Sequence, residues 1–125
     1  MPSRIIAVAV DCPSDPAQAK RLRDFWCEAL DYRESRHWRD AEGTEYVEIT
    51  GDGPMLLFQP VGEDKRTKNR LHLDIAPAEG DQPSEVARLV AFGAEVTSDD
   101  PVFPWVVLAD PAGNEFCVLP PRSGG

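Results

Sequence analysis

The stretch Trp105–Phe116, which reads WVVLADPAGNEF, decides the fold. It opens with an apolar, β-branched run and then passes through Asp-Pro-Ala-Gly-Asn, residue types that favour tight turns. The apolar character then resumes and continues to Leu119. This pattern predicts two neighbouring strands, Trp105–Ala109 and Glu115–Leu119, joined by a short turn.

A strand and a helix are predicted upstream of these two strands. Leu71–Ile75 has the apolar content of a strand and stops at Ala76-Pro77. Pro83 suits the first turn of a helix, and Gly93 suits its end. One more short strand, Glu95–Thr97, follows that helix. The second half of the chain therefore has the order strand, helix, strand, strand, strand.

The first half repeats this order. Ile5–Val10 is a β-branched run typical of a buried strand. Asp15 can cap a helix that starts at Pro16 and ends near Asp31. Three further strands are predicted at Arg33–Asp40, Thr44–Thr50 and Met55–Gln59. We therefore predict an α+β domain covering residues 1–125, made of two βαβββ modules at about 4–61 and about 70–121, with a polar linker between them.

Composition narrows the classes of function. The chain has 125 residues and a formal net charge of -9, which argues against binding to nucleic acid or to an anionic membrane. No apolar stretch approaches the ~20 residues of a membrane span, and no secretory leader is recognisable. The three cysteines, Cys12, Cys27 and Cys117, suggest neither a disulfide framework nor a zinc knuckle. We expect a cytoplasmic protein with reduced thiols.

Several segments together resemble the vicinal oxygen chelate superfamily, in its glyoxalase-like branch that includes bleomycin-resistance-type binding proteins. They are the Asp15-Pro16 helix with Phe25-Trp26, the segment Arg70–Asp74, the sequence Phe92-Gly93-Ala94, and above all Trp105–Phe116. The resemblance implies that the modules form curled mixed sheets around a cleft that holds a small molecule. It also implies a homodimer.

The resemblance also locates candidate metal ligands, because metal-dependent members place one on the first strand and one on the last strand of each module. Matching the prolines that end these strands pairs Val8 with His72 and Leu57 with Cys117. Valine and leucine have no donor atom, and one His with one Cys is not the set that Mg, Mn, Ni or Fe(II) prefers. We therefore predict no cofactor, and a bound divalent metal is the less favoured alternative.

Strand alternation suggests which side chains line a ligand site. His72 and Asp74 share one face of their predicted strand, as do Glu115 and Cys117 on the last strand. His72 is either a hydrogen-bonded sheet residue or a proton-transfer group, and it is the catalytic candidate of the chain. Cys117 is either a small apolar residue or a nucleophile. The candidate ligand-binding residues are His72, Asp74, Leu57, Gln59, Val8, Cys117, Glu115, Trp38 and Trp105. For the two tryptophans, a place in the core or a dimer interface is an equal alternative.

Three functions remain open. The first is a metal-independent glyoxalase-like protein that binds a small organic molecule, either to sequester it or to transform it with His72 as a proton carrier. The second is a metal-dependent lyase or dioxygenase in which His72 acts with Gln59, Glu115 or Cys117. The third is a non-catalytic interaction module. No dinucleotide, P-loop, nucleophile-elbow or HExxH motif points elsewhere.

Overall fold

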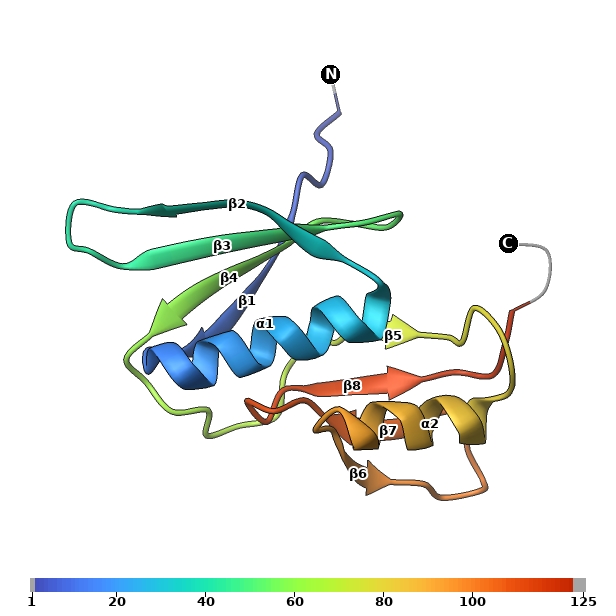
Figure 1. The fold of residues 1–125 in the computed structure, drawn as a ribbon. Coiled ribbons are helices and arrows are strands. Elements are labelled where there is room, and N and C mark those ends of the chain that lie inside the picture. The colour runs from blue at the N-terminus through green and yellow to red at the C-terminus, as the bar shows by residue number, and fades with distance from the viewer. Residues whose placement is uncertain (1, 123–125) are drawn as a thin grey trace. The chain divides into compact units, whose positions relative to one another are not determined.

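A computed structural model describes residues 2–122 of the chain. The chain folds into two compact units, the first ending at Asp64 and the second beginning at Lys65. Each unit contains one helix and one four-stranded mixed sheet, as Figure 1 shows. The predicted α+β class and the tandem βαβββ modules are confirmed. Within residues 2–122, no helix has the combined length and apolar character that crossing a bilayer requires.

The first unit forms a sheet with the strand order β1-β4-β3-β2. β1 runs parallel to β4, and the other neighbours are antiparallel. This mixture follows from the connections, because a helix carries the chain back between parallel strands while short turns join antiparallel ones. The elements are β1 (Val8–Pro13), α1 (Pro16–Leu30), β2 (Arg33–Arg39), β3 (Glu45–Thr50) and β4 (Leu56–Val61).

The helix α1 begins and ends where its capping residues require. The carboxylate of Asp15 accepts a hydrogen bond from the backbone N–H of Gln18 at 3.0 Å, and Pro16 occupies the first turn. Asp31 ends the helix in the left-handed conformation, with φ 57. Such a residue turns the chain out of the helix and lets its N–H reach a terminal carbonyl, here that of Cys27. The predicted bounds of this helix are confirmed.

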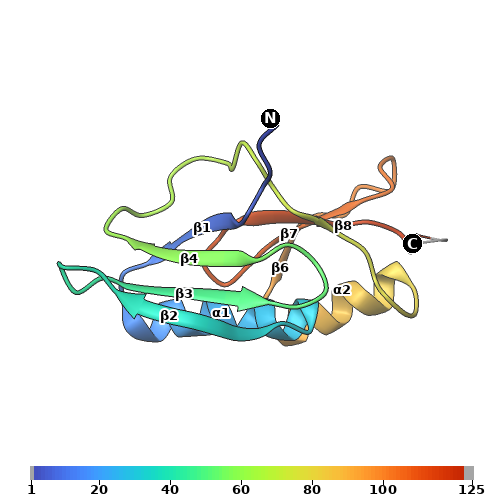
Figure 2. The same ribbon diagram turned by 90° about the horizontal axis from the view of Figure 1, so that it is seen from above.

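The helix α1 packs against one face of the first sheet (Figure 2), and the buried residues of that face are apolar. Leu22 and Trp26 of the helix are almost fully buried, as are Ile49 and Phe58 of the sheet. Burial of a side chain of this size contributes about 1.5–3 kcal/mol to stability. This apolar layer therefore stabilises the first unit, and the side chains on the opposite face of the sheet lie outside it.

The second unit repeats the plan with the strand order β5-β8-β7-β6. Its helix packs against β6 and β8 and buries Leu89 completely, next to the buried sheet residues Leu108 and Val118. Asp81 caps that helix by accepting from the N–H of Ser84 at 2.9 Å, and the helix starts at Gln82, one residue before the predicted Pro83. The elements are β5 (Asp74–Ile75), α2 (Gln82–Ala91), β6 (Glu95–Ser98), β7 (Val106–Ala109) and β8 (Glu115–Val118).

The first strand of each module differs from its predicted range. β1 starts at Val8, which pairs with Leu56, so Ile5 and Ile6 precede the sheet and are 85% and 73% exposed. The described residues just before β4, 51–54, form no strand that could pair with them. β5 shrinks to two residues, although the N–H of Cys117 still donates to the carbonyl of Leu73 at 2.9 Å.

The two modules match in strand register. Both outer strands carry an irregularity at the same place, between Glu34 and Arg36 in β2 and between Val96 and Ser98 in β6. One row across the first sheet joins Ala9, Leu57, Glu48 and Arg36, and the corresponding row across the second joins Asp74, Cys117, Val107 and Ser98. Directly paired residues point to the same face of a sheet, so each row lies on the face opposite the helix.

Candidate functional site

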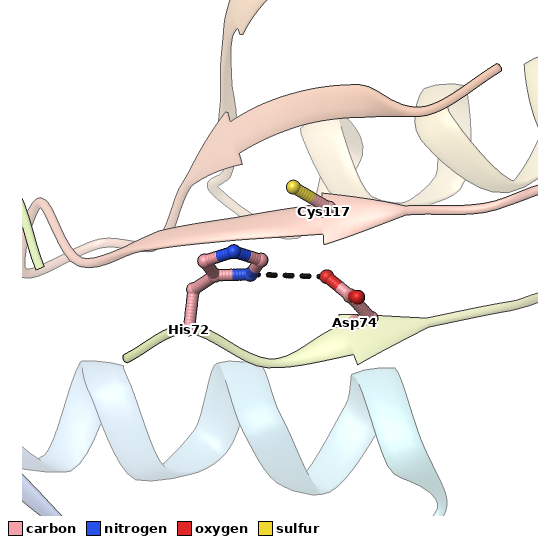
Figure 3. Close-up of side chains that lie close together, drawn as sticks. All are labelled: His72, Asp74 and Cys117. Atoms are coloured by element: carbon pink, nitrogen blue, oxygen red, sulfur yellow. Dashed lines mark ion pairs between the residues drawn. The ribbon is translucent and has the colours of Figure 1, made fainter. Parts of the chain in front are cut away.

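Three polar side chains of the second unit come together on the helix-free face of its sheet. His72 precedes β5, Asp74 lies in β5, and Cys117 lies opposite Asp74 in β8. Figure 3 shows all three side chains on one side of these strands. Potential ligand atoms of the three residues lie within 4.8 Å of one another. This group, called the His72 cluster below, is the candidate site.

The His72 cluster contains a close histidine–carboxylate contact. Nδ1 of His72 lies 3.0 Å from Oδ1 of Asp74. The carboxylate can only accept, so in the neutral imidazole the proton is on Nδ1 and Nε2 is the basic nitrogen. The His72 and Asp74 side chains are 41% and 50% exposed, so a molecule from solvent can reach them. Asp74 thus orients a proton acceptor at an accessible position.

Cys117 is the buried member of the cluster, with 8% of its surface exposed. Burial raises the pKa of its thiol, and the charge of Asp74 and a hydrogen bond to that carboxylate raise it further. A nucleophilic cysteine needs a lowered pKa, because the thiolate is the reactive form. The geometry therefore opposes the nucleophile interpretation and favours a small side chain that donates to Asp74.

Glu115 has a structural partner. Its carboxylate accepts from Nζ of Lys65 at 2.8 Å and from the backbone N–H of Asn69 at 3.0 Å. The hydrogen bond from Lys65 and then that from Asn69 lower the pKa of Glu115 to about 2. This carboxylate fastens the segment that leads to His72 onto the start of β8, an arrangement that sequence reasoning missed.

The first unit's register corrects one matched position. Val8 pairs with Leu56, a residue of the helix-covered face, whereas Leu57 pairs with Ala9. Val8 therefore lies on the face opposite Leu57, and the strand register does not match Val8 with His72. Ala9, which corresponds to Asp74, brings no donor atom to the helix-free face. Gln59 lies on this open face, two residues beyond Leu57 and paired with Asp11.

The two tryptophans lie in different surroundings. Trp38 in β2 stacks on Tyr46 of β3 at 5.6 Å between ring centroids, and the guanidinium of Arg36 lies 4.7 Å above the Trp38 ring. Trp105 precedes β7 and stacks on Phe103 at 4.9 Å within its own loop. Neither tryptophan belongs to the His72 cluster.

Sequence reasoning also missed the burial of Glu48. This glutamate lies in the middle of β3, paired with Leu57 on one side and Arg36 on the other, and is only 7% exposed. The signal was present in the sequence, because Glu48 interrupts the apolar residues Val47 and Ile49 in a central strand. Strand alternation places it on the helix-free face.

Comparison with known proteins agrees with this architecture. The family model described as glyoxalase-like domain matches residues 7–119. The chain belongs to the glyoxalase-like domain family. Among curated proteins, no match was found.

Solved structures show the same fold as this glyoxalase-like chain. The fosfomycin resistance protein FosX from Listeria monocytogenes superposes with a TM-score of 0.75 at 11% identity, over 98% of this chain and 94% of that one. A crystal of the same Listeria protein with Mn(II) and sulfate gives 0.73 at 11% identity, over 99% and 96%. Glyoxalase I from Leishmania major, described as trypanothione-dependent, gives 0.65 at 19% identity, over 94% and 86%.

The donor atoms of this chain test whether a family-type metal would fit. On the first unit, Ala9 and Leu57 supply no ligand at the matched row. The His72 cluster offers one nitrogen, one oxygen and one sulfur, and the sulfur is a poor ligand for the hard cations Mg²⁺ and Mn²⁺. The same three donors suit zinc, which binds Cys, His and Asp side chains.

Proposed function

We propose that this glyoxalase-like protein binds a small organic molecule on the helix-free face of its sheets and needs no resident metal to do so. The observation that carries the proposal is the His72 cluster, where an oriented imidazole and a buried thiol share one accessible face. Sites for small molecules combine apolar surface with a few positioned polar groups. Val107, paired with Cys117, supplies apolar surface in the same row.

Nε2 of His72 is the atom that we assign to the bound molecule. Held by Asp74 through Nδ1, the neutral ring presents Nε2 as a hydrogen-bond acceptor and proton acceptor. A binding protein uses this nitrogen to orient a ligand that leaves unchanged. An enzyme uses it to take a proton from the ligand during the reaction.

A thermal-shift screen of metabolites and antibiotics tests the proposal. A molecule that binds only the folded chain raises its Tm, by an amount that grows with concentration. We expect His72→Ala to abolish the Tm shift. The control His37→Ala, which replaces the second histidine of the chain in β2, should preserve the shift. A screen in which no compound raises the Tm, or in which both variants respond like the parent, would contradict the proposal.

Incubation with each compound that raises the Tm then separates the two roles of His72. Recovery of unchanged ligand indicates sequestration. Formation of product, with a large loss of rate in His72→Ala, indicates an enzyme.

The second candidate function is zinc-dependent catalysis, favoured by the three different donors within 4.8 Å. His72, Asp74 and Cys117 would hold the ion, which when bound supplies a Lewis acid. Binding would have to release the proton of Cys117, whose pKa is raised. Zinc retained at about one equivalent after purification without chelator, and lost in Cys117→Ser, would support this function. Less than about a tenth of an equivalent, with no Tm increase on adding zinc, would exclude it.

We also propose, from the family resemblance, that the chain forms a homodimer. Sedimentation equilibrium tests this directly, and a monomer mass at all concentrations would contradict it. The cytoplasm is the compartment we propose, because all three cysteines are free thiols and burial raises the pKa of each.

A further inference from the structure

The segment that leads to His72 is strongly basic, although the chain as a whole is acidic. Residues 65–70 read KRTKNR and hold four of the 13 basic residues of a chain whose formal net charge is -9. Cations gathered beside an accessible site raise the local concentration of anions. The charge of this segment is therefore a second source of information about the ligand of the His72 cluster.

Hydrogen bonds fasten this basic segment to the second sheet. Nζ of Lys65 donates to the carboxylate of Glu115 at 2.8 Å and also to the carbonyl of Thr67. The backbone N–H of Asn69 donates to the same carboxylate at 3.0 Å. Position 68 lies between two of these attached residues. The backbone of Lys68 is therefore held next to the start of β8.

This attachment brings Lys68 close to the His72 cluster. Glu115 and Cys117 are two residues apart on β8, so their side chains share a face and their Cα atoms are about 7 Å apart. Burial is the largest influence on the pKa of the Cys117 thiol and raises it, whereas the charge of Lys68 acts in the opposite direction. A charge in solvent has such an effect only within about 10 Å. The electrostatics and the hydrogen bonds thus place the ammonium group in the same region.

Lys68 is a cation without a partner in this region. Lys65 is paired with Glu115, and the carboxylate of Asp74 lies 3.0 Å from Nδ1 of His72. The side chain of Lys68 forms no hydrogen bond or ion pair within residues 2–122, and the residue is exposed. Asp74 repels an anion, so an anionic group of a ligand fits at the Lys68 end of the site.

We propose that the molecule bound at the His72 cluster is a small hydroxy acid, whose carboxylate pairs with Nζ of Lys68 and whose hydroxyl donates to Nε2 of His72. The neutral imidazole accepts at Nε2 because its Nδ1 carries the proton that faces Asp74. Both Lys68 and His72 are exposed, so a molecule from solvent can reach them. This inference deepens the proposed function by naming the class of ligand, and it rests on that function.

Three matched probes test the two contacts by NMR titration. Mandelate carries both the carboxylate and the hydroxyl, mandelamide lacks the charge, and phenylacetate lacks the hydroxyl. We expect mandelate to shift the backbone amides of residues 68, 72 and 117, and to bind about three- to tenfold more tightly than either analogue. Equal or tighter binding of mandelamide would overturn the assignment of Lys68, and equal binding of phenylacetate would overturn that of the hydroxyl.

Two substitutions in the basic segment make the test specific. Lys68→Gln removes the charge, and should reduce the affinity for mandelate to within about twofold of that for mandelamide. Arg66→Gln removes the same charge two residues earlier in the same segment, and should leave the affinity for mandelate within about twofold of the parent value. An equal loss in both variants would show general attraction by the segment and would overturn the proposal, as would full affinity in Lys68→Gln.

The dependence on salt supplies a second readout. Raising NaCl from about 0.05 M to about 0.5 M should weaken mandelate and leave mandelamide unchanged, because salt screens the exposed charge pair. An affinity for mandelate that does not change with salt would contradict the pairing with Lys68.

Failure of this inference can be told from failure of the proposed function. If other compounds bind and respond to His72→Ala while mandelate causes no shift at about 50 mM, where even a millimolar complex is nearly saturated, the hydroxy-acid assignment fails and the proposed function stands. If no compound binds, both fail.

Discussion

Glu115→Gln should loosen the segment that carries His72. In the folded chain, Lys65 donates to the Glu115 carboxylate at 2.8 Å and the backbone N–H of Asn69 donates at 3.0 Å. A glutamine side chain can still accept from Asn69, but it loses the charge that holds Lys65. The segment between these residues then has one fewer attachment to β8.

The structure sets the size of this effect. The hydrogen bond from Lys65, followed by that from Asn69, lowers the pKa of Glu115 from 4.5 to about 2. A difference of about 2.5 pKa units corresponds to at most about 3.4 kcal/mol of stability. The side chains of Lys65 and Glu115 are 25% and 21% exposed, so solvent screens part of the interaction. We expect Glu115→Gln to lower the free energy of unfolding by about 1–2 kcal/mol at pH 7.

The effect should depend on pH in a defined direction. A carboxylate whose folded pKa is lowered stabilises the protein fully above its unfolded pKa, and this contribution disappears as pH falls through the folded value. The difference between parent and variant should therefore be constant above pH 4.5 and shrink as pH falls towards about 2.

Urea unfolding followed by tryptophan fluorescence at pH 7, 5, 4 and 3 measures this difference. Glu95→Gln is the matched control, because it removes one negative charge from an exposed position on β6 of the same unit. A Glu115→Gln effect that is the same at every pH, or equal to that of Glu95→Gln, would refute the reasoning.

Three further predictions concern packing and local geometry. Leu22→Ala should lower the free energy of unfolding by about 3–5 kcal/mol, measured by urea denaturation, because Leu22 is fully buried under the first sheet. Asp31→Gly should raise it by up to about 1 kcal/mol, since Asp31 has φ 57 and glycine adopts that conformation without strain; a lower stability would contradict this. Burial, the largest influence, raises the pKa of Cys12 to about 11, so its alkylation by iodoacetamide in the folded chain should keep accelerating above pH 9. A rate that reaches a plateau by pH 9 would contradict that assignment.

Local sequence signals predicted the fold because each one specifies a helix end or a turn without contacts to distant residues. Asp15 followed by Pro16 defines a helix start through one side-chain hydrogen bond and one fixed dihedral angle, and the structure places the helix there. The turn before Glu115 is equally local, since Asp110 accepts from the N–H groups of Ala112 and Asn114 at 2.9 Å. Interactions within four residues of each other can be recognised in a sequence.

The candidate site could be predicted only in part, because it depends on strand register and on contacts between residues far apart in the sequence. Matching the prolines made Val8 the equivalent of His72 in the other module. However, parallel pairing with β4 sets the register of β1, and that register puts Val8 on the face covered by the helix. The tie from Glu115 to Lys65 spans 50 residues, and no pattern within either segment indicates it. The pairing of His72 with Asp74 was within reach, because alternation alone places them on one face.

The corresponding rows of the two sheets carry different polar side chains on the same strand arrangement. In the first row, the carboxylate of Glu48 lies on the third strand of its module and the cation of Arg36 on the second strand. In the second row, the carboxylate of Asp74 lies on the first strand, next to His72, and the thiol of Cys117 on the last.

Neither row disturbs the apolar layer under its helix, because alternation keeps the two faces of a strand independent. Residues on the helix-free face can therefore change without loss of the fold. The chain shares its fold with FosX and glyoxalase I at 11% and 19% sequence identity. For this reason, the shared fold gives no information about the ligand of this chain. Ligand chemistry in this chain has to be determined from its own side chains on the helix-free faces, the His72 cluster first among them.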